Sequence, residues 1–538
     1  MYRFFKIVLV LLFSVSLQAQ NIQRPKLVVG LVIDQMRWDY LYRYYDRYSA
    51  NGGFKRLLSQ GFSCENTMIP YTPTVTACGH SSIYTGSVPA ISGITGNFWW
   101  DNELGREVYC TEDKTVKTVG SNSSLGEMSL RNLLVTTVCD ELKLAINFQS
   151  KVIGVALKDR GGILTAGPSA NAAYWYDNTT GDWITSTYYM SDLPQWVKDF
   201  NAKKLVDKYY EQGWNTLYKI NTYIQSTPDN TTWEGSLSRL KNFPYETKGF
   251  AGKNYGAIAT MPQGNTLTAE MAKAAIVGEQ LGADDITDFL AVSFSSPDYI
   301  GHTFGPNSIE EEDCFLRLDK DLGDLLSYLD SKVGKDQYLV FLSADHGVAH
   351  VPDYLKSKNI PAGKIELLNL RKQMNIALRE TFKDSFIVSS DNYQLYLNHQ
   401  KIDSLKLDIE VIKKWVIKYL LSKPEVARAF ALDKLVETTL NAVQKNMLVN
   451  GYYPRRSGDV QIILQPNVIE GFINSGTTHG LWNPYDAHIP LLWYGWGIKK
   501  GKTNREVQMT DIAPTVSAML HIQMPNGCVG KVIEEVMK

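Results

Sequence analysis

Hydrophobic residues along the chain gather into short continuous runs, each of which ends at a polar residue or a turn. Five such runs are rich in β-branched residues: 26–33, 152–157, 289–294, 338–342 and 489–494. Continuous apolar runs indicate strands that are buried on both faces, as in a parallel sheet covered by helices. Helical periodicity lies between them, most clearly over 267–281 and 309–329. The pattern therefore predicts an α/β fold with a mainly parallel central sheet flanked by helices.

Two stretches depart from this pattern. Residues 165–250 are rich in Tyr, Trp, Asn and Thr and show little strand patterning, whereas residues 360–470 mix helical and short strand signals. We interpret both as insertions on one catalytic domain spanning 20–538, able to form a lid or crown. In open α/β sheets the ligand site lies beyond the carboxyl ends of the strands. Such a lid or crown is therefore expected above the site.

The N-terminal segment has the features of a secretory signal peptide, predicted to cover residues 1–19. Arg3 and Lys6 precede a mostly apolar run over 7–17, and Ala19 supplies a small residue for cleavage. The run is shorter than the approximately 20 residues that span a bilayer. An uncleaved N-terminal anchor is the alternative. We expect a periplasmic or secreted protein without a membrane span after cleavage.

Composition narrows the class of protein. The chain has 55 Lys and Arg against 56 Asp and Glu, a net charge of −1, which argues against binding nucleic acid through bulk charge. With 44% hydrophobic and 21% charged residues, it is expected to be globular with a sizeable core. Some disulfides are expected in an exported chain, but the sequence does not choose their pairing. The six cysteines are Cys64, Cys78, Cys110, Cys139, Cys314 and Cys528.

Two short motifs follow predicted strands and combine carboxylates with imidazoles. Asp298 and His302 are four positions apart, so on a helix they face the same way and can reach one metal ion. Asp345 and His346 are adjacent at a strand end, where Gly347 permits the turn that would bring both to one ion. Taken singly, each motif has a structural alternative, such as a chance spacing or a solvated turn.

Two further candidates strengthen these motifs. His479 lies in Thr-Thr-His-Gly, and Asp34 closes the first predicted strand; alone, either is accounted for as a structural histidine or a helix cap. Together, three carboxylates and three imidazoles suit two zinc ions with mixed nitrogen and oxygen ligands. The other histidines are expected to be structural or on the surface: His80, His350, His399, His488 and His521.

Thr76 is the candidate nucleophile. It lies in Pro-Thr-Val-Thr-Ala-Cys-Gly-His, at the predicted start of a helix that follows a polar loop. A hydroxyl at a helix N-terminus gains from the positive end of the helix dipole, and a nearby zinc ion would lower its pKa. A simple helix N-cap is the alternative.

The combined motifs resemble those of the alkaline phosphatase superfamily, and most of all its phosphate-irrepressible, PafA-type branch in Bacteroidota. They occur in the family's order over nearly the whole mature chain: Asp34, TVTACGHSSIYTG, SSPDYIGHTFGP, SADHG, TTHG and HIPLLWYGWG. The resemblance implies an alkaline-phosphatase-like core. It also implies one zinc held by Asp298, His302 and His479, and a second held by Asp34, Asp345 and His346, with the nucleophile Thr76 bound to it.

The resemblance also assigns residues to the substrate. Asn97 matches the family's phosphate-contacting Asn, and Lys158 with Arg160 match the Lys-x-Arg pair of this branch's monoesterases. Their alternative is a solvated strand-end pair on either side of Asp159. No residues matching the magnesium site of the serine-nucleophile branch are found, so two zinc ions are expected.

These features predict an alkaline phosphatase that hydrolyses small phosphate monoesters through a phosphothreonine, acts as a monomer and has no specific nucleic-acid partner. A phosphodiesterase or nucleotide pyrophosphatase of the same superfamily would share the metal ligands and Asn97, but is not expected to place Lys158 and Arg160 against the free phosphate oxygens. A sulfatase is disfavoured because no Arg follows Cys78 in the required pattern. A non-catalytic glycan-binding protein would leave the ordered metal residues unexplained.

Overall fold

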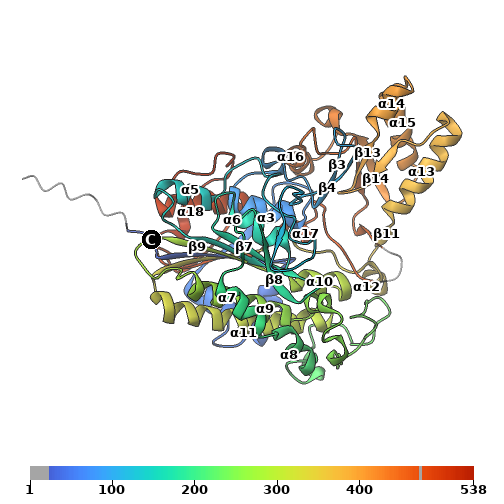
Figure 1. The fold of residues 1–538 in the computed structure, drawn as a ribbon. Coiled ribbons are helices and arrows are strands. Elements are labelled where there is room, and N and C mark those ends of the chain that lie inside the picture. Colours follow the sequence, from blue (N-terminus) through green and yellow to red (C-terminus); the bar gives the residue numbers. More distant parts are fainter. Residues whose placement is uncertain (1–22, 472–474) are drawn as a thin grey trace, which may run out of the picture.

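The computed structural model describes residues 23–471 and 475–538, so the predicted signal peptide lies outside the described residues. Its centre is a large sheet with helices on both faces (Figure 1). No helix in the described part of the chain combines the length and apolar character needed to cross a membrane.

Neighbouring parallel strands form the middle of this sheet and confirm the α/β prediction. Their order is β10 (Tyr338–Ser343), β1 (Leu27–Ile33), β9 (Asp288–Phe294), β6 (Val152–Ala156) and β7 (Ala172–Asp177). All residues of these strands are buried, which is why their sequences are continuous apolar runs rather than alternating ones.

Both edges of the sheet are largely antiparallel. Next to β10 lie β18 (Leu491–Gly495), β2 (Phe62–Met68), β17 (His488–Ile489) and β19 (Gly501–Gln508), of which β19 alone is parallel to its partner β2. At the other edge, β8 (Asp182–Ser186) and β5 (Thr118–Val119) follow β7. The apolar run at 489–494 is therefore an antiparallel strand, interrupted at Pro490, which has no N–H for the ladder.

Helices cover the two faces of the sheet (Figure 1). One face carries α3 (Thr76–Thr85), α5 (Val138–Ala145), α6 (Asp159–Ala166) and α18 (Ile512–Leu520). The opposite face carries α7 (Gln195–Ala202), α9 (Gln263–Gly278) and α11 (Ile309–Leu329). The two long periodic patterns in the sequence correspond to α9 and α11.

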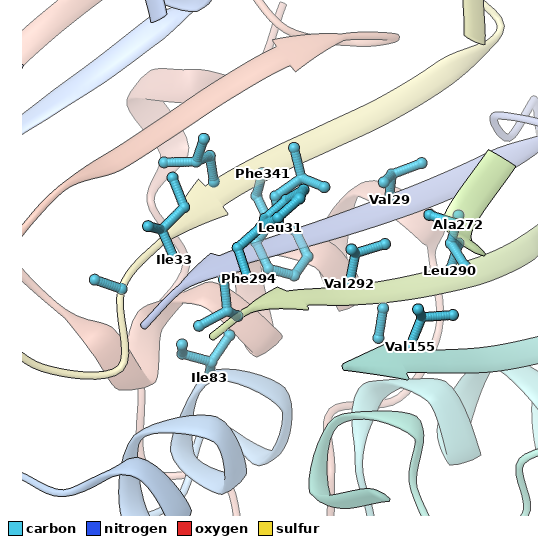
Figure 2. Packing of buried hydrophobic residues seen from close by; sticks show 14 of the residues in the cluster. Val29, Leu31, Ile33, Ile83, Val155, Ala272, Leu290, Val292, Phe294 and Phe341 are labelled. Atoms are coloured by element: carbon cyan, nitrogen blue, oxygen red, sulfur yellow. The ribbon is translucent and has the colours of Figure 1, made fainter. Parts of the chain in front are cut away.

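The core packs α3 tightly against β1. Figure 2 shows Ile83 of α3 beneath strand residues that include Ile33 and Phe294. At Gly30 of β1 the approach is so close that a Cβ atom would lie 2.2 Å from the Tyr84 hydroxyl. The absence of a side chain at position 30 therefore lets the helix that begins at Thr76 lie directly on the strand that precedes Asp34.

The first part of the segment 165–250, which we interpret as an insertion, contributes two strands to the central sheet. Residues 172–177 and 182–186 form β7 and β8 of the central sheet. The aromatic residues that disguised them, such as Trp175 and Trp183, are buried side chains of the core. The rest of this segment contains α7, α8 (Leu205–Gln212) and short 3₁₀ turns.

The region 360–470 forms its own small layer. A four-stranded sheet has the order β12 (Ile387–Ser389), β13 (Gln394–Leu397), β15 (Val460–Leu464), β14 (Val426–Ala431). It packs with α13 (Leu367–Phe382), α14 (His399–Ser404) and α15 (Ile409–Leu420), largely around a separate hydrophobic cluster. These helices protrude from the central layers in orange in Figure 1. Short α16 (Ala442–Gly451) follows β14.

All six cysteines are free thiols in this structure, so none of the disulfides expected for an exported chain is formed. Five of them are buried, and Cys528 is partly exposed. The large apolar core makes such cross-links unnecessary for the fold.

We predict that Gly30→Ala lowers the free energy of unfolding by about 1–3 kcal/mol, the usual range for overpacking a dense core. The added methyl group would meet Tyr84 and Phe341. Gly249→Ala is the matched control, because a Cβ there has no neighbour within 4 Å among the described residues. Urea unfolding of both variants measures the difference; equal midpoints would contradict the close packing of α3 on β1.

Candidate metal centre and active site

The site lies where four neighbouring parallel strands end. In the order β10, β1, β9 and β6, each strand leads directly into residues predicted to be functional. Asp345 follows β10, Asp34 follows β1, Asp298 follows β9, and Lys158 follows β6. Because carboxyl ends of parallel strands share one edge, residues far apart in sequence meet there.

The first group consists of Asp298, His302 and His479, whose ligand atoms lie within 4.8 Å of one another. Asp298 and His302 are one turn apart on α10 (Ser296–Phe304), with His302 Nε2 3.2 Å from Asp298 Oδ1. His479 comes from a distant loop and places Nε2 3.6 Å from the same oxygen. The predicted i, i+4 pair is therefore completed by the histidine of the Thr-Thr-His-Gly motif.

The second group consists of Asp34, Asp345 and His346 and satisfies the same distance limit. His346 Nε2 lies 3.5 Å from Asp34 Oδ1 and 3.4 Å from Asp345 Oδ2. The imidazoles of His346 and His479 stack with centroids 3.5 Å apart, so the two groups are adjacent. The structure thus sorts the predicted carboxylates and imidazoles into the two expected triads.

Each imidazole of the triads is oriented by a carbonyl group of the backbone. The contacts run from Nδ1 of His302 to Thr477 (2.9 Å), from His346 to Gly347 (2.9 Å) and from His479 to Thr74 (2.7 Å). Because a carbonyl only accepts, Nδ1 carries the proton in each ring, and the lone pair of Nε2 faces the carboxylates. This is the arrangement that metal-binding histidines commonly have.

The carboxylates also fit a cation. Asp34 Oδ1 and Asp345 Oδ2 are buried and accept no hydrogen bond from the described residues. Buried carboxylate oxygens without partners are costly unless a cation compensates them. Burial, followed by the charges of Asp298 and Asp345, raises the pKa of Asp34 well above its ordinary value. A metal ion between these groups would remove that penalty.

Exposure differs between the triads. The His302 side chain is 36% exposed, whereas that of His346 is fully buried. Burial, with the neighbouring His346 and His302, holds the pKa of His479 well below its ordinary value, so this ring is neutral and able to ligate. The first triad therefore faces solvent and the second is sealed beneath it.

Thr76 is the first residue of α3 and is buried. Its hydroxyl lies 3.4 Å from Nε2 of His346, next to the second triad. Asn97 Oδ1 accepts a hydrogen bond of 2.9 Å from the N–H of Ala77, which holds the Asn97 side chain beside Thr76. The predicted nucleophile and the predicted phosphate-contacting amide are thus neighbours.

Lys158 connects the two triads. Its ammonium lies 2.6 Å from Asp34 Oδ2 and 2.5 Å from Asp298 Oδ2. Burial acts to lower the pKa of Lys158, but Asp298 and Asp34 outweigh burial and raise it above its ordinary value. Lys158 is therefore a fixed buried cation at the centre of the site and not a solvated strand-end residue.

Arg160 is held by residues that the sequence did not single out. Its guanidinium donates a 3.0 Å hydrogen bond to the Tyr109 hydroxyl, which in turn donates to Asp159 at 2.8 Å. Thr111 also donates to Asp159. Tyr109 ends β4 (Arg106–Tyr109), and only the general richness in tyrosine hinted at a role for such residues.

The site contains two further buried polar residues to which the sequence assigned no functional role. His80, expected to be structural, contacts the carbonyl of Thr76 and the Ser293 hydroxyl and lies 3.2 Å from Asp345. Gln35 directly follows Asp34 and forms hydrogen bonds to carboxylates of both triads. A buried amide has no characteristic spacing in sequence, so no motif revealed Gln35.

Known proteins are similar to this chain in sequence and in fold. The family of type I phosphodiesterases and nucleotide pyrophosphatases matches residues 28–477. The chain belongs to this family, within the alkaline phosphatase superfamily. It is 56% identical to alkaline phosphatase PhoV of Synechococcus elongatus, over 97% of this chain and 95% of that protein.

PafA-type enzymes are similarly close. The chain is 52% identical to alkaline phosphatase PafA of Elizabethkingia meningoseptica, covering 98% of each protein. A crystal structure of wild-type alkaline phosphatase PafA superposes with a TM-score of 0.94 at 51% identity, covering 96% of this chain and all of that one. The PafA-like core expected from the motifs is thereby confirmed.

Proposed function

We propose that this protein is an exported, zinc-dependent alkaline phosphatase that cleaves phosphate monoesters into an alcohol and inorganic phosphate through a phosphothreonine intermediate. The observation that carries the proposal is the set of two adjacent triads with Thr76 beside one of them. Alkaline phosphatases PhoV and PafA, at 56% and 52% identity over nearly the whole chain, support the activity.

Zinc suits the donor set. Each triad offers carboxylate oxygens and imidazole Nε2 atoms, which zinc accepts together in catalytic sites that keep an open position. When bound, two zinc ions would supply positive charge to the attacking and leaving oxygens of an in-line displacement. Asp298, His302 and His479 would hold the more exposed ion, and Asp34, Asp345 and His346 the buried one.

Thr76 supplies the nucleophile in this proposal. Its oxygen attacks phosphorus, the bond from phosphorus to the alcohol oxygen breaks, and the alcohol leaves with a proton. Water then attacks the phosphothreonine, which releases inorganic phosphate and restores the hydroxyl. The helix N-terminus of α3 favours negative charge on the threonine oxygen in both steps.

Lys158, Arg160 and Asn97 would bind the phosphate oxygens. Lys158 is a buried cation and Arg160 a partly buried one, both at the start of α6. A monoester dianion carries more negative charge on its free oxygens than a diester. Phosphoryl transfer depends mainly on positioning and charge stabilisation. The pair would therefore select monoesters.

The second candidate is a phosphodiesterase or nucleotide pyrophosphatase. The observation in its favour is the match of residues 28–477 to that family. Against it, we propose that Lys158 and Arg160 contact the free phosphate oxygens, which would leave no room for a diester's second substituent. Comparing matched aryl monoesters and diesters separates the two activities.

Cellular location and partners complete the proposal. A leader over residues 1–19 would direct the protein to the periplasm or the medium. All six proposed metal ligands come from one chain, so each chain would carry a complete site. We propose a monomer that acts on small phosphate esters.

We expect two zinc ions per chain after gel filtration, because the structure has two separate triads. His302→Ala should lose about one ion, since it removes one of three ligands. His399→Ala is the control, because His399 pairs with Asp459 in the layer formed by residues 360–470 and belongs to neither triad. Active wild-type enzyme with less than about one zinc per chain, or full activity after prolonged chelation, would overturn the assignment.

Thr76→Ala should reduce turnover on the order of 10⁴-fold or more, as loss of a nucleophile commonly does. Thr76→Ser should retain a large part of the activity, because the attacking hydroxyl survives. Acid quenching during turnover should trap phosphothreonine in the wild type. Near-normal turnover of Thr76→Ala with its zinc intact would require another nucleophile or direct attack by water.

The Lys158→Ala, Arg160→Ala double variant should lose about 3–6 kcal/mol of transition-state stabilisation on monoesters, from about 1.5–3 per charged hydrogen bond. Its weak diesterase activity should change far less. Arg160→Ala alone is the cleaner variant, because Arg160 contacts Tyr109 and no metal ligand among the described side-chain hydrogen bonds. Equal losses of kcat/KM on both ester classes would mean that these residues maintain the fold or the metals.

A further inference from the structure

Gln35 occupies a backbone position that does not favour its side chain. The N–H of Met36 donates to the carbonyl of Ile33 at 3.2 Å, so residues 33–36 form a tight turn after β1. Gln35 is the third residue of this turn and has φ = 66°. Turns with positive φ at this position usually have glycine or asparagine there. The backbone alone therefore gives no reason for glutamine.

The Gln35 side chain is fully buried and points at the metal ligands. Its Nε2 donates a 2.7 Å hydrogen bond to Asp298 Oδ1, and its backbone N–H donates a 3.1 Å bond to Asp345 Oδ1. Since an ionised carboxylate only accepts, the contact with Asp298 also fixes which end of the amide carries the nitrogen. One residue thus binds a carboxylate from each triad.

The opposite helix leaves room for this contact. At Gly301 of α10, a Cβ atom would lie 1.9 Å from Gln35 Oε1. Gly301 lies between Asp298 and His302 of the first triad, so any side chain there would displace Gln35. The Asp-x-x-Gly-His motif over 298–302 therefore contains two candidate metal ligands and, at Gly301, the space that the Gln35 amide occupies.

Asp298 is consequently held at both oxygens. Lys158 lies against Oδ2 and Gln35 against Oδ1. Lys158 forms ion pairs with both triads, whereas the neutral amide of Gln35 adds a directional hydrogen bond to Asp298. Such a bond restricts rotation of the carboxylate that would ligate an ion together with His302 and His479.

We propose that Gln35 is a positioning residue that clamps Asp298 to Asp345 and so sets the geometry of the two metal sites relative to each other. This inference rests on the proposed two-zinc function. The amide nitrogen donates to Asp298 and not to the proposed nucleophile Thr76. It acts through Asp298, while its N–H fixes Asp345.

Two variants remove the side-chain contact of Gln35 with Asp298 and leave its backbone N–H in place. Gln35→Gly suits the positive φ and keeps the N–H bond to Asp345, but removes the bond to Asp298. Gln35→Met keeps much of the buried volume and removes the same bond. Both should bind zinc at the first triad about 10–100-fold more weakly, the usual effect of losing a hydrogen-bond partner of a metal ligand. The second triad should keep its ion.

The measurement is zinc release from the purified holoenzyme to a competing chelator of known affinity, followed as two steps. Thermal unfolding of the metal-free protein is recorded alongside. A merely structural role would lower the unfolding temperature of the metal-free variants without changing zinc affinity. For the Gln35→Met variant, added zinc should restore much of kcat.

Gly301→Ala gives an independent test through a double-mutant cycle. Alone, the methyl group should displace Gln35 and weaken the first zinc. When Gly301→Ala is combined with Gln35→Gly, the methyl group occupies the space that the glutamine side chain has left. It should then cause little further loss of zinc affinity. Additive losses of zinc affinity would show that Gly301 acts without Gln35 and would overturn the clamp.

The outcomes also distinguish this inference from the proposed function. If wild-type enzyme holds two zinc ions and both Gln35 variants release them like the wild type, the clamp is wrong and the zinc enzyme stands. If the wild type itself holds no zinc, the proposed function fails before the variants are compared.

Discussion

The arrangement of the site depends on the order of four parallel strands, β10, β1, β9 and β6. Each strand is held by its neighbours in register, so the residues after the strands cannot change their spacing without breaking the ladder. Asp345, Asp34, Asp298 and Lys158 follow these strands. A rigid sheet edge is the kind of support that a metal centre requires, because small displacements of ligands cost affinity.

This order also brings three carboxylates into a buried space, where their mutual repulsion must be compensated. Lys158 offsets part of the charge between the two triads, and bound cations would offset the rest. The acidic ligands follow the ends of β10, β1 and β9, whereas Lys158 follows β6. Carboxylates after three strands are thus partly neutralised by the ammonium after a fourth. Lys158 therefore belongs to the candidate metal centre as well as being a candidate substrate ligand.

Sequence patterns predicted the features that repeat or have a fixed spacing. Continuous apolar runs revealed the central strands, and the i, i+4 spacing of Asp298 and His302 required only a helix to bring them together. The direction of a strand could not be predicted from its apolar residues. Antiparallel β18, within the run at 489–494, is largely buried and therefore as apolar as the parallel strands. The aromatic β7 was mistaken for an insertion because Tyr and Trp serve both cores and binding surfaces. Tertiary partners such as Tyr109 left no periodic signal.

The two cations at the start of α6 differ in what their loss would disturb. Lys158 contacts carboxylates of both triads, whereas Arg160 is anchored by Tyr109. Tyr109 belongs to the hairpin of β3 (Phe98–Asp101) and β4, which directly follows Asn97. A changed hairpin would therefore shift the anchor of Arg160 while leaving the triads on the central sheet. The architecture thus separates two sets of contacts: Asp345, Asp34 and Asp298 follow strands of the central sheet, whereas Arg160 depends on a hairpin outside that sheet for its anchor.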